Sequence, residues 1–533
     1  MAHALERVPP GLRLPLLWQV LLALAAGLAQ AAALAWPWGG APQWGLQVAS
    51  MVVLAVLLHP GVPWRRAATL GGVFSTAWLA GTFWWLFISM HTYGGLAAPL
   101  AVAAVLGLAA FLGSYYALVA GLFAALAPRR RTLAALVFGA FWLLAELARG
   151  TWWTGFPWGA GGYAHVQGPL AALARYVGVY GIGFVAAVLA MLLAQARPRD
   201  ARNPRAWALL ALVVAVLGAL ALQRQRALDM PEGNTGAPLT LALLQGNIPQ
   251  DEKFQPGSGL PLALQWYGEQ LRSATAQLVV APETAIALLP QQLSPGYLDA
   301  IAQQYTSGAQ AALVGIPLGD MESGYTNAVL GWQPGQAQPY RYDKHHLVPF
   351  GEFIPPFFRW FTDLMHIPLG DFNRGALVQP PLVWRGERLA PNICYEDLFG
   401  EELGARFADA ASAPTVFVNL SNIGWFGNTL AIDQHLAISR MRALEFERPM
   451  VRATNTGATA IIDHSGVVTQ QLERHQRGVL TGQVQGRSGA PTPYGAWVSR
   501  WGLWPLWALG LAVACAALWH RRRPAARRQP GRA

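Results

Sequence analysis

Three residues whose side chains could together perform nucleophilic catalysis stand at the ends of apolar runs in the second half of the chain. Glu283 closes the run QLVVAPE, Lys344 lies in YRYDKHHLVPFGEFIP, and Cys394 ends the run LAPNIC. A carboxylate can take the proton of a thiol, and an ammonium can stabilise first the thiolate and then an oxyanion. The residue types predict a nucleophile at Cys394, a general base at Glu283 and an electrostatic partner at Lys344.

Each of these residues also has a plainer interpretation when it is taken alone. A single cysteine among apolar residues is usually a small buried hydrophobe. Glu283 could be a carboxylate at a strand end that pairs with any cation, and Lys344 could be a solvated loop lysine. A free thiol with a pKa near 8.5 is only partly ionised at neutral pH, so reactivity requires the three residues to meet.

The sequences around the three residues are similar to the motifs of a known superfamily. In the order Glu, Lys, Cys, the strings APET, YDKHHLVPFGEFIP and NICYEDLF resemble the nitrilase superfamily of carbon–nitrogen hydrolases. KHHLVPFGEFIP followed by NICYE, SNIGWFG and RATNTGATA resembles its integral-membrane branch, the apolipoprotein N-acyltransferases. The motifs cover residues 238–485. The resemblance implies a four-layer αββα sandwich for this part of the chain.

The resemblance also implies that further residues matter in the site. Glu352 could hold the site lysine in place or relay a proton, and the backbone amide of Tyr395 could complete an oxyanion hole. Tyr395 and Glu396 could equally be packing and capping residues. Phe254 stands where the family commonly carries tryptophan, which keeps an aromatic contact but loses an indole N–H. Ile423 stands where an acidic residue is expected.

The reaction that the resemblance implies joins two lipid substrates. A phospholipid donates an acyl chain to Cys394, and the α-amino group of a diacylglyceryl-cysteine at the N-terminus of an apolipoprotein accepts it. We expect no metal or other cofactor, since His345 and His346 lack partners at the spacing of a metal site. A membrane-anchored amidase or nitrilase is the nearest alternative. A transporter or receptor with a ligand-binding α/β domain is an alternative of another class.

Composition indicates that much of the chain lies in a membrane. Hydrophobic residues make up 54% of the 533 residues and charged residues 12%, and the mean hydropathy is +0.30. The 23 tryptophans fit aromatic belts at the membrane interface. The net charge of +11 could suggest a nucleic-acid partner, but the basic residues collect in short loops between apolar segments and at the C-terminus. Cys515 lies in one of the apolar segments, so a disulfide between it and Cys394 is not expected. We therefore expect both cysteines to be free thiols.

Eight apolar segments are candidates for membrane-spanning helices, since a bilayer core requires about 20 helical residues. The second is short, and the fourth is long enough to be tilted or kinked near Gly113. The eight segments cover residues 14–35, 46–59, 67–90, 96–127, 133–148, 177–196, 206–222 and 501–519.

The distribution of arginine predicts how these segments are oriented. Arginines follow segments two, four, six and eight, whereas the connections after segments one and three contain no Lys or Arg. The positive-inside rule then places both termini in the cytoplasm. The resemblance implies that the membrane is the inner membrane of a bacterium. We expect a transmembrane domain at 1–229, a periplasmic nitrilase-like catalytic domain at 230–490, and a last span with a basic cytoplasmic tail at 491–533. A cleaved signal peptide is the alternative for the N-terminus.

The regions on either side of the predicted domain boundary differ in pattern. From residue 238 onward, short β-like runs alternate with helices, which predicts an α/β layered domain. The connection 149–176 is too polar and too rich in glycine to span a bilayer, and Glu146 and Arg149 beside it are spaced to form a pair. Its aromatic residues suit the headgroup level or a platform beside a lipid entrance; they are Trp152, Trp153, Phe156 and Trp158.

Overall fold

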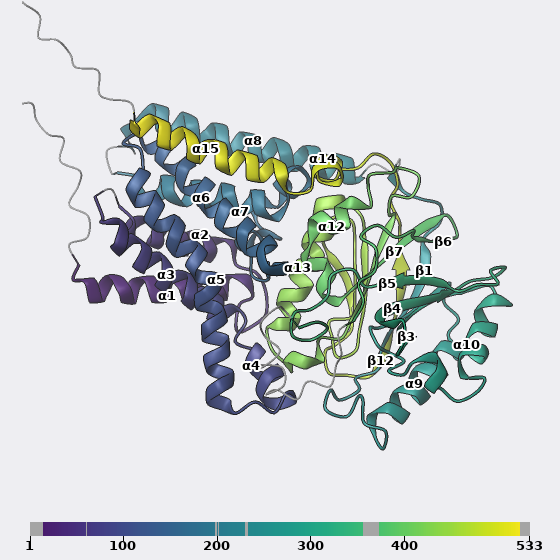
Figure 1. Cartoon of the computed structure of the whole chain (residues 1–533). Helices are drawn as coiled ribbons and strands as arrows, with labels where there is room; N and C mark the ends of the chain where they lie inside the picture. Colours follow the sequence, from purple (N-terminus) through teal and green to yellow (C-terminus); the bar gives the residue numbers. More distant parts are fainter. Residues whose placement is uncertain are drawn as a thin grey trace, which may run out of the picture.

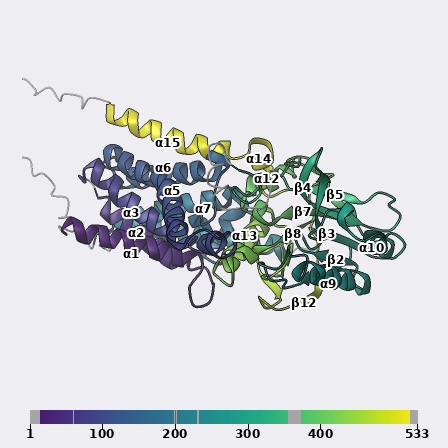
Figure 2. The same cartoon turned by 60° about the horizontal axis from the view of Figure 1, so that its bottom comes forward.

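The chain forms a bundle of long helices that packs against a pair of β-sheets. The computed structural model describes residues 14–59, 61–197, 200, 202–229, 233–354 and 372–522. Figure 1 shows the bundle beside the sheets, and Figure 2 shows the same division from below. The basic tail from residue 523 and the residues before residue 14 lie outside the described residues.

The bundle follows the apolar segments of the sequence. Among the described residues, four helices are long and apolar enough to cross a membrane, or up to six if two bent helix pairs each count as one span. The eight predicted spans are therefore not confirmed among the described residues. The long helices of the bundle are α1 (Leu16–Leu34), α2 (Trp44–Leu57), α3 (Trp64–Thr82), α5 (Ala98–Leu126), α6 (Arg131–Thr151), α7 (Ala174–Ala194), α8 (Pro204–Asp229) and α15 (Trp504–Arg522).

Several helices differ from the predicted spans in length or continuity. With 14 residues, α2 is too short to cross a bilayer core unaided. After α3 the chain turns by 61° into α4 (Leu86–Ile88) and η1 (Ser89–Tyr93), and α14 (Pro493–Trp501) meets α15 at 88°. By contrast α5 is uninterrupted over 29 residues, so the chain has no break at Gly113. Part of α8 has no described side chains.

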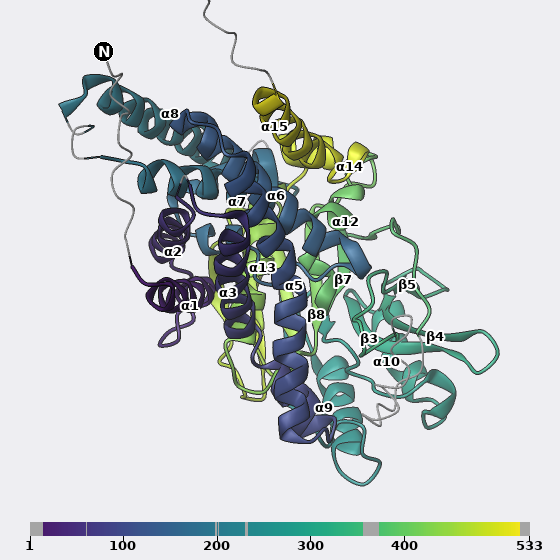
Figure 3. The ribbon, with the colours of Figure 1, turned by 60° about the vertical axis from the view of Figure 1, so that its left-hand side comes forward.

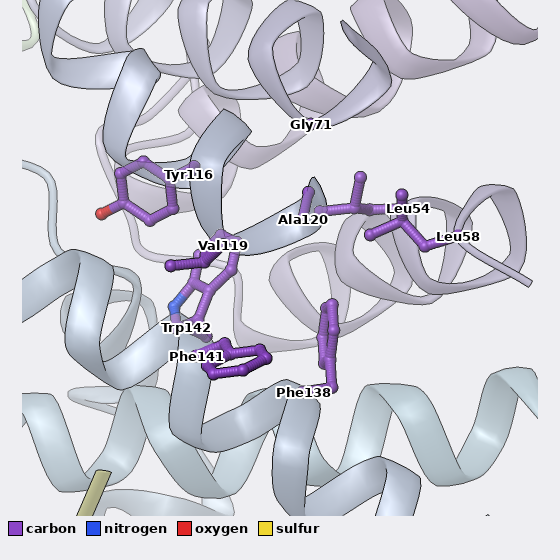
Figure 4. A pocket seen from close by; sticks show the side chains of 9 residues that line it. All are labelled: Leu54, Leu58, Gly71, Tyr116, Val119, Ala120, Phe138, Phe141 and Trp142. Carbon is purple, nitrogen blue, oxygen red and sulfur yellow. The ribbon is translucent and has the colours of Figure 1, made fainter. Parts of the chain in front are cut away.

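Small residues and aromatic rings let the helices of the bundle pack closely. The rings of Trp78 and Trp142 stack with centroids 5.5 Å apart at an interplanar angle of 18°. A Cβ atom added at Gly71 would lie 2.5 Å from the side chain of Ala120, which is the close approach of helices that small residues permit in membranes. Figure 4 shows a small apolar cavity of about 20 Å³ beside Trp142, far from the predicted catalytic residues.

Two six-stranded sheets form the second part of the molecule. The first has the order β12-β1-β2-β3-β4-β5 and the second β11-β10-β9-β8-β7-β6. The strands of the first are β1 (Leu239–Gln245), β2 (Leu278–Ala281), β3 (Ala311–Asp320), β4 (Gly324–Trp332), β5 (Tyr340–Asp343) and β12 (Gly478–Val484). Those of the second are β6 (Leu382–Trp384), β7 (Glu387–Ile393), β8 (Val416–Ser421), β9 (Met450–Thr454), β10 (Ala460–Ile462) and β11 (Val468–Gln471).

The sheets pack face to face and are covered by helices on their outer faces. Alternate side chains of both sheets, among them Leu241 and Val418, form one core between them. The outer face of the first sheet packs on α9 (Gly259–Ser273) and α10 (Tyr297–Thr306). The second packs on α12 (Gly400–Ala405) and α13 (Ala431–Phe446). The layers thus run helix, sheet, sheet, helix, in agreement with the α/β part of the predicted fold.

The connection between α6 and α7 packs between the bundle and the second sheet. It contains three short helices, η2 (Trp152–Thr154), η3 (Gly161–His165) and η4 (Pro169–Leu173). Trp158 is buried, and its indole N–H donates a hydrogen bond to Gln434 on α13. Trp152 and Trp153 are exposed. The prediction of a headgroup-level cluster is therefore wrong for Trp158, because this ring is buried against Gln434 of α13.

The predicted pair of Glu146 and Arg149 is also wrong. Glu146 accepts a hydrogen bond from the backbone N–H of Gly161 at 2.9 Å. Arg149 donates to the carbonyl oxygens of Phe156 at 2.6 Å and Trp158 at 2.8 Å. Both side chains therefore form hydrogen bonds with backbone groups of the connection between α6 and α7. The spacing of the two residues on one helix does not indicate these bonds.

Glu445 on α13 makes a buried polar contact across this junction. Its carboxylate accepts from the backbone N–H of Val179 on α7 at 2.8 Å and from Arg442 at 3.0 Å. Burial raises the pKa of Glu445 to about 7, although the Arg442 guanidinium opposes the shift. A carboxyl group whose pKa is higher in the folded than in the unfolded protein stabilises the fold fully at pH values below the pKa of the unfolded state. That contribution is lost as the pH rises through the pKa of the folded state, about 7.

We expect the thermal unfolding midpoint in detergent to fall by several degrees as the pH rises from about 5 to about 8. The Glu445→Gln variant should show a smaller fall, because its amide does not titrate. Glu401 and Glu402, whose pKa values burial also raises to about 7, should keep part of the slope in the variant. Differential scanning fluorimetry at both pH values measures the effect, and an equal slope in both proteins contradicts the role of Glu445.

Candidate active site

The predicted nucleophile lies at the sharp turn that follows β7. Ile393 is extended, with φ −109°, and Cys394 then adopts φ +51° at the start of η8 (Cys394–Leu398). This left-handed region is unfavourable for a residue with a side chain and is found where the surroundings impose it, often at functional sites. The turn sets the thiol at the carboxyl end of β7, beside the ends of the parallel strands β8 and β9.

Glu283 lies two residues after the end of β2, and its carboxylate is surrounded by donors. Oε1 accepts from Asn327 Nδ2 at 2.8 Å and from Lys344 Nζ at 3.2 Å. Oε2 accepts from the backbone N–H of Asn422, which follows β8, at 2.8 Å. The side chain is almost entirely buried. The carboxylate therefore joins the ends of strands from both sheets.

Lys344 follows β5 and is held between two carboxylates. Its Nζ lies 3.2 Å from Glu283 Oε1 and 2.9 Å from Glu352 Oε1, and the side chain is 1% exposed. Glu352 is fixed in turn, because its Oε2 accepts from the backbone N–H of Val348 at 2.8 Å. Asn327 Nδ2 bridges the two carboxylates, at 2.8 Å from Glu283 and 2.7 Å from Glu352. This arrangement supports the interpretation that Glu352 holds the lysine in place.

The charges in this cluster set the protonation states that the chemistry requires. Burial raises the pKa of the Cys394 thiol to about 12; Glu283 adds to the rise and Lys344 opposes it. Burial would also raise the pKa of Glu283, but Lys344 and the Asn327 amide hold it below its usual value. The pKa of Lys344 is raised by Glu283 and Glu352 against the effect of burial. At neutral pH the site thus holds a thiol, a carboxylate and an ammonium, so Cys394 requires a base.

A second buried lysine belongs to the same cluster and was not singled out from the sequence. Lys253 donates to the carbonyl oxygen of Glu283 at 3.2 Å and to the hydroxyl of Thr284 at 2.7 Å. Burial lowers its pKa to about 7, against the attraction of Glu283 and Cys394. In the sequence it stands in DEKF, which is typical of a solvated surface segment. Only the adjacent motif QGNIPQ hinted that the segment enters the site.

Glu396 ties the nucleophile turn to the segment that carries the site lysine. Its carboxylate accepts from the backbone N–H groups of Ile393 at 2.6 Å, His345 at 2.7 Å and His346 at 3.2 Å. The Tyr342 hydroxyl donates to the same carboxylate. Both ends of the site are thereby fixed by one buried side chain, so the geometry assigns Glu396 a positioning role.

Tyr395 points away from the sheets toward the connection between α6 and α7. Its hydroxyl donates to the carbonyl of Gly155 at 3.1 Å, and its ring stacks on Phe156 with centroids 6.3 Å apart. Burial raises the pKa of this phenol, so it stays protonated. The side chain of Tyr395 therefore joins the nucleophile turn to the bundle, and only its backbone amide is left for the predicted oxyanion hole.

The two positions that depart from the family pattern each adjoin a residue that contacts Glu283: Phe254 follows Lys253, and Ile423 follows Asn422. Phe254 is 43% exposed and its ring lies 6.4 Å from that of Trp425, which in turn contacts Tyr93 of η1 edge-on at 6.0 Å. Phe254 thus belongs to an aromatic rim that reaches the bundle. Ile423 is buried in the apolar core shared with the bundle, where an acidic side chain would have no water.

The described ranges hold no group of three or more His, Cys, Asp and Glu side chains that could bind a metal ion. His346 instead contacts Glu402 at 2.8 Å and stacks on Phe399. Cys394 and Cys515 are both free. The cluster places a thiol near a carboxylate and an ammonium, the groups that a base-activated cysteine would require.

The fold defines a class, a protein of the carbon–nitrogen hydrolase type built onto an apolar helical bundle. Residues 240–494 match the carbon-nitrogen hydrolase family, and residues 26–192 match the apolipoprotein N-acyltransferase N-terminal domain. The crystal structure of a carbon-nitrogen hydrolase from Helicobacter pylori G27 aligns with 51% of this chain and 94% of its own, with TM-score 0.34 and 14% identity.

Relatives of similar length extend the match to nearly the whole chain. An apolipoprotein N-acyltransferase of Verminephrobacter eiseniae is 69% identical over 503 residues, which cover 92% of this chain and 94% of that protein. One of Ralstonia nicotianae is 46% identical over 486 residues, 91% of this chain and 90% of that protein. The chain belongs to the apolipoprotein N-acyltransferase family, and it is an acyltransferase enzyme.

Proposed function

We propose that the protein transfers an acyl chain from a phospholipid to the α-amino group of the diacylglyceryl-modified cysteine at the N-terminus of apolipoproteins. The transfer runs through a thioester on Cys394 and is the last step of bacterial lipoprotein maturation. Membership of the family supports lipoprotein N-acylation in general. The observation that carries the mechanism is the buried Glu283–Lys344 ion pair beside the nucleophile turn.

In the first half-reaction, Cys394 attacks the ester carbonyl of the phospholipid. Glu283 takes the thiol proton as the S–C bond forms, because the raised thiol pKa leaves little thiolate at neutral pH. The Lys344 ammonium and the backbone amide of Tyr395 stabilise the oxyanion. When the C–O bond breaks, Glu283 returns the proton to the leaving lysophospholipid.

In the second half-reaction, the acceptor amine attacks the thioester. An α-amino group has a pKa of about 7.7–8.0, so a useful fraction is unprotonated at neutral pH. Glu283 takes the amine proton and passes it to the Cys394 sulfur as the C–S bond breaks. An amide is more stable than a thioester, so the sequence of steps requires no nucleotide and no cofactor.

The bundle supports the proposal that the substrates are lipids. Cys394 lies at a turn whose next side chain, Tyr395, packs on the connection between α6 and α7. The acyl chain is then held at the membrane surface, and the thioester is shielded from bulk water. We place the catalytic domain at 230–490 in the periplasm, anchored in the inner membrane by the spans at 1–229 and 491–533, with both termini in the cytoplasm.

Intact-protein mass spectrometry after incubation with phospholipid alone tests the proposal. We expect the mass of one acyl chain on the enzyme, removable by neutral hydroxylamine and absent in Cys394→Ala. A lipopeptide with a diacylglyceryl-cysteine should discharge the adduct into an amide. Steady release of free fatty acid without the acceptor would instead identify a hydrolase, and no adduct at all would exclude the thioester.

Reporter fusions test the orientation. Alkaline phosphatase fused after Gly233 should be active, because the arginine-rich connections hold the preceding segments with that end outside. A fusion in the arginine-rich connection after α5 should be inactive and serves as the matched control. An inactive fusion at Gly233 together with an active control fusion would show that the topology is the reverse of the predicted one.

A further inference from the structure

A fully buried polar network lies directly behind the nucleophile and takes no part in the mechanism above. Asp397 lies in η8, three residues after Cys394, whereas His435 and Ser439 lie one turn apart on α13 and Arg452 lies on β9. The guanidinium of Arg452 pairs with Asp397 Oδ2 at 3.0 Å and contacts the Ser439 hydroxyl. Ser439 also donates to Asp397. The network fixes η8 to α13.

The contacts of His435 determine which ring nitrogen carries the proton. Arg452 Nη2 lies 3.1 Å from His435 Nδ1, and a guanidinium can only donate, so Nδ1 accepts. The proton of the neutral ring is therefore on Nε2. This N–H points at Asp397 Oδ1 at 2.8 Å and at the carbonyl oxygen of Cys394 at 3.2 Å. His435 thus links the backbone of the nucleophile to a buried ion pair.

The hydrogen bond to this carbonyl restrains an unfavourable backbone conformation. Cys394 has φ +51°, and a residue with a side chain keeps such a conformation only where the surroundings impose it. A change of its backbone dihedrals would turn the carbonyl oxygen away from His435. The other donor within reach, Asn419 Nδ2, lies 3.5 Å away. Of the contacts that these two side chains make with the Cys394 carbonyl, that of His435 is therefore the shorter.

The neighbouring residue on α13 contacts the bundle. Gln434 Oε1 accepts from the indole N–H groups of Trp85 at 3.1 Å and Trp158 at 2.8 Å, and its Nε2 donates to the carbonyl of Thr82 at 3.0 Å. Thr82 ends α3 and Trp85 precedes α4, so Gln434 lies at the break in this helix pair. Figure 1 shows α13 between the bundle and strand β7, and Figure 3 views α13 from the bundle side, partly behind the bundle helices.

We propose that His435 is a positioning residue that holds the backbone of Cys394 in its reactive conformation. We also propose that Gln434, through its hydrogen bonds to the bundle, fixes the position of His435. The nucleophile is then aligned only while the break between α3 and α4 and the ring of Trp158 are docked on α13. The inference rests on the proposed nucleophile Cys394. It makes the α3–α4 break a functional part of the enzyme.

Two isosteric substitutions test the role of His435, because each replaces a different ring nitrogen. In His435→Gln the side-chain amide can reach the position of Nε2 and still donate to the Cys394 carbonyl. In His435→Asn the shorter amide replaces Nδ1 and leaves that carbonyl without its donor. Both are made in a Cys515→Ala background, where Cys394 is the only thiol.

The readouts are the alkylation rate of Cys394 by iodoacetamide, followed by mass spectrometry, and the rate of acyl-enzyme formation from phospholipid. We expect His435→Asn to lower both rates about tenfold or more, since small misplacements of reacting groups are costly. His435→Gln should stay within about threefold of the parent. Equal rates in the two variants would overturn the role of His435. If the parent forms no acyl-enzyme with phospholipid, the proposed function fails. The alkylation rates of the variants still test the role of His435 in that case.

Gln434→Leu tests the link to the bundle, because it removes all three hydrogen bonds at similar volume. We expect a decrease in both rates with an unchanged KM for phospholipid, which separates misalignment from weaker binding. Trp158→Phe removes only one indole donor and should give a smaller decrease, and it serves if Gln434→Leu does not fold. Unchanged rates in the variants that fold would overturn the role of Gln434.

Discussion

A Glu283→Gln variant should form the acyl-enzyme about 10²–10⁴-fold more slowly than the wild type at neutral pH, the usual contribution of a general base. The reason is the environment of Cys394. Burial raises the pKa of its thiol to about 12, so the thiolate is scarce unless a base takes the proton. The amide of glutamine cannot do so. Single-turnover acylation with phospholipid, followed by mass spectrometry, measures the loss.

The pH dependence distinguishes a lost base from a damaged fold. The pKa of Glu283 lies below its usual value, so the wild type should be insensitive to Glu283 ionisation from about pH 6 upward. In Glu283→Gln only the spontaneously ionised thiol can react, so the rate should rise about tenfold per pH unit between about 7 and 9. A variant that keeps at least about a tenth of the rate with a flat profile would show that Glu283 is not the base.

The three central residues could be predicted because their local patterns are strong. Glu283 and Cys394 each follow an apolar run, Lys344 stands in a segment rich in aromatic residues, and the structure places each just beyond a strand, after β2, β5 and β7. β2 and β5 belong to the first sheet and β7 to the second, so the three side chains converge where strand ends of the two facing sheets meet. That convergence needs only local pattern and the family order, both of which are present in the sequence.

The supporting residues could not be predicted in the same way, because their role depends on burial by distant segments. Lys253 stands among charged residues, yet the fold closes over it and directs its ammonium at Glu283 and Thr284. Asn327 lies inside an ordinary strand pattern, and its bridge between two carboxylates exists only when β4 and the Lys344 segment are adjacent. No spacing in the sequence indicates either contact.

The connection between α6 and α7 shows the same limit for the bundle. Its tryptophans fit a membrane interface by composition, but Trp158 is instead buried against Gln434 of α13. The breaks in the helices are equally hidden. Gly178, inside the segment predicted as a span, has φ +64° and a Cβ there would clash with the ring of Tyr494. A hydropathy pattern reports apolar length and not where a helix must bend around another domain.

A Lys344→Met variant should lose about 10²–10³ in kcat, the typical effect of removing one oxyanion donor. Methionine keeps most of the volume but removes the ammonium that lies 3.2 Å from Glu283 and 2.9 Å from Glu352. The two carboxylates, which share the Asn327 amide, then face each other without the ammonium between them. One of them should take up a proton. The variant is therefore expected to be both less active and less stable.

The double variant Lys344→Met/Glu352→Gln separates the two effects. It removes one carboxylate together with the cation, so the like-charge repulsion disappears and the thermal unfolding midpoint should return toward that of the wild type. The acylation rate should stay as low as in Lys344→Met, since no donor replaces the ammonium at the oxyanion. If the rate instead recovers to within about tenfold of the wild type, the lysine acts only by balancing the two carboxylates, and oxyanion stabilisation must come from the backbone alone.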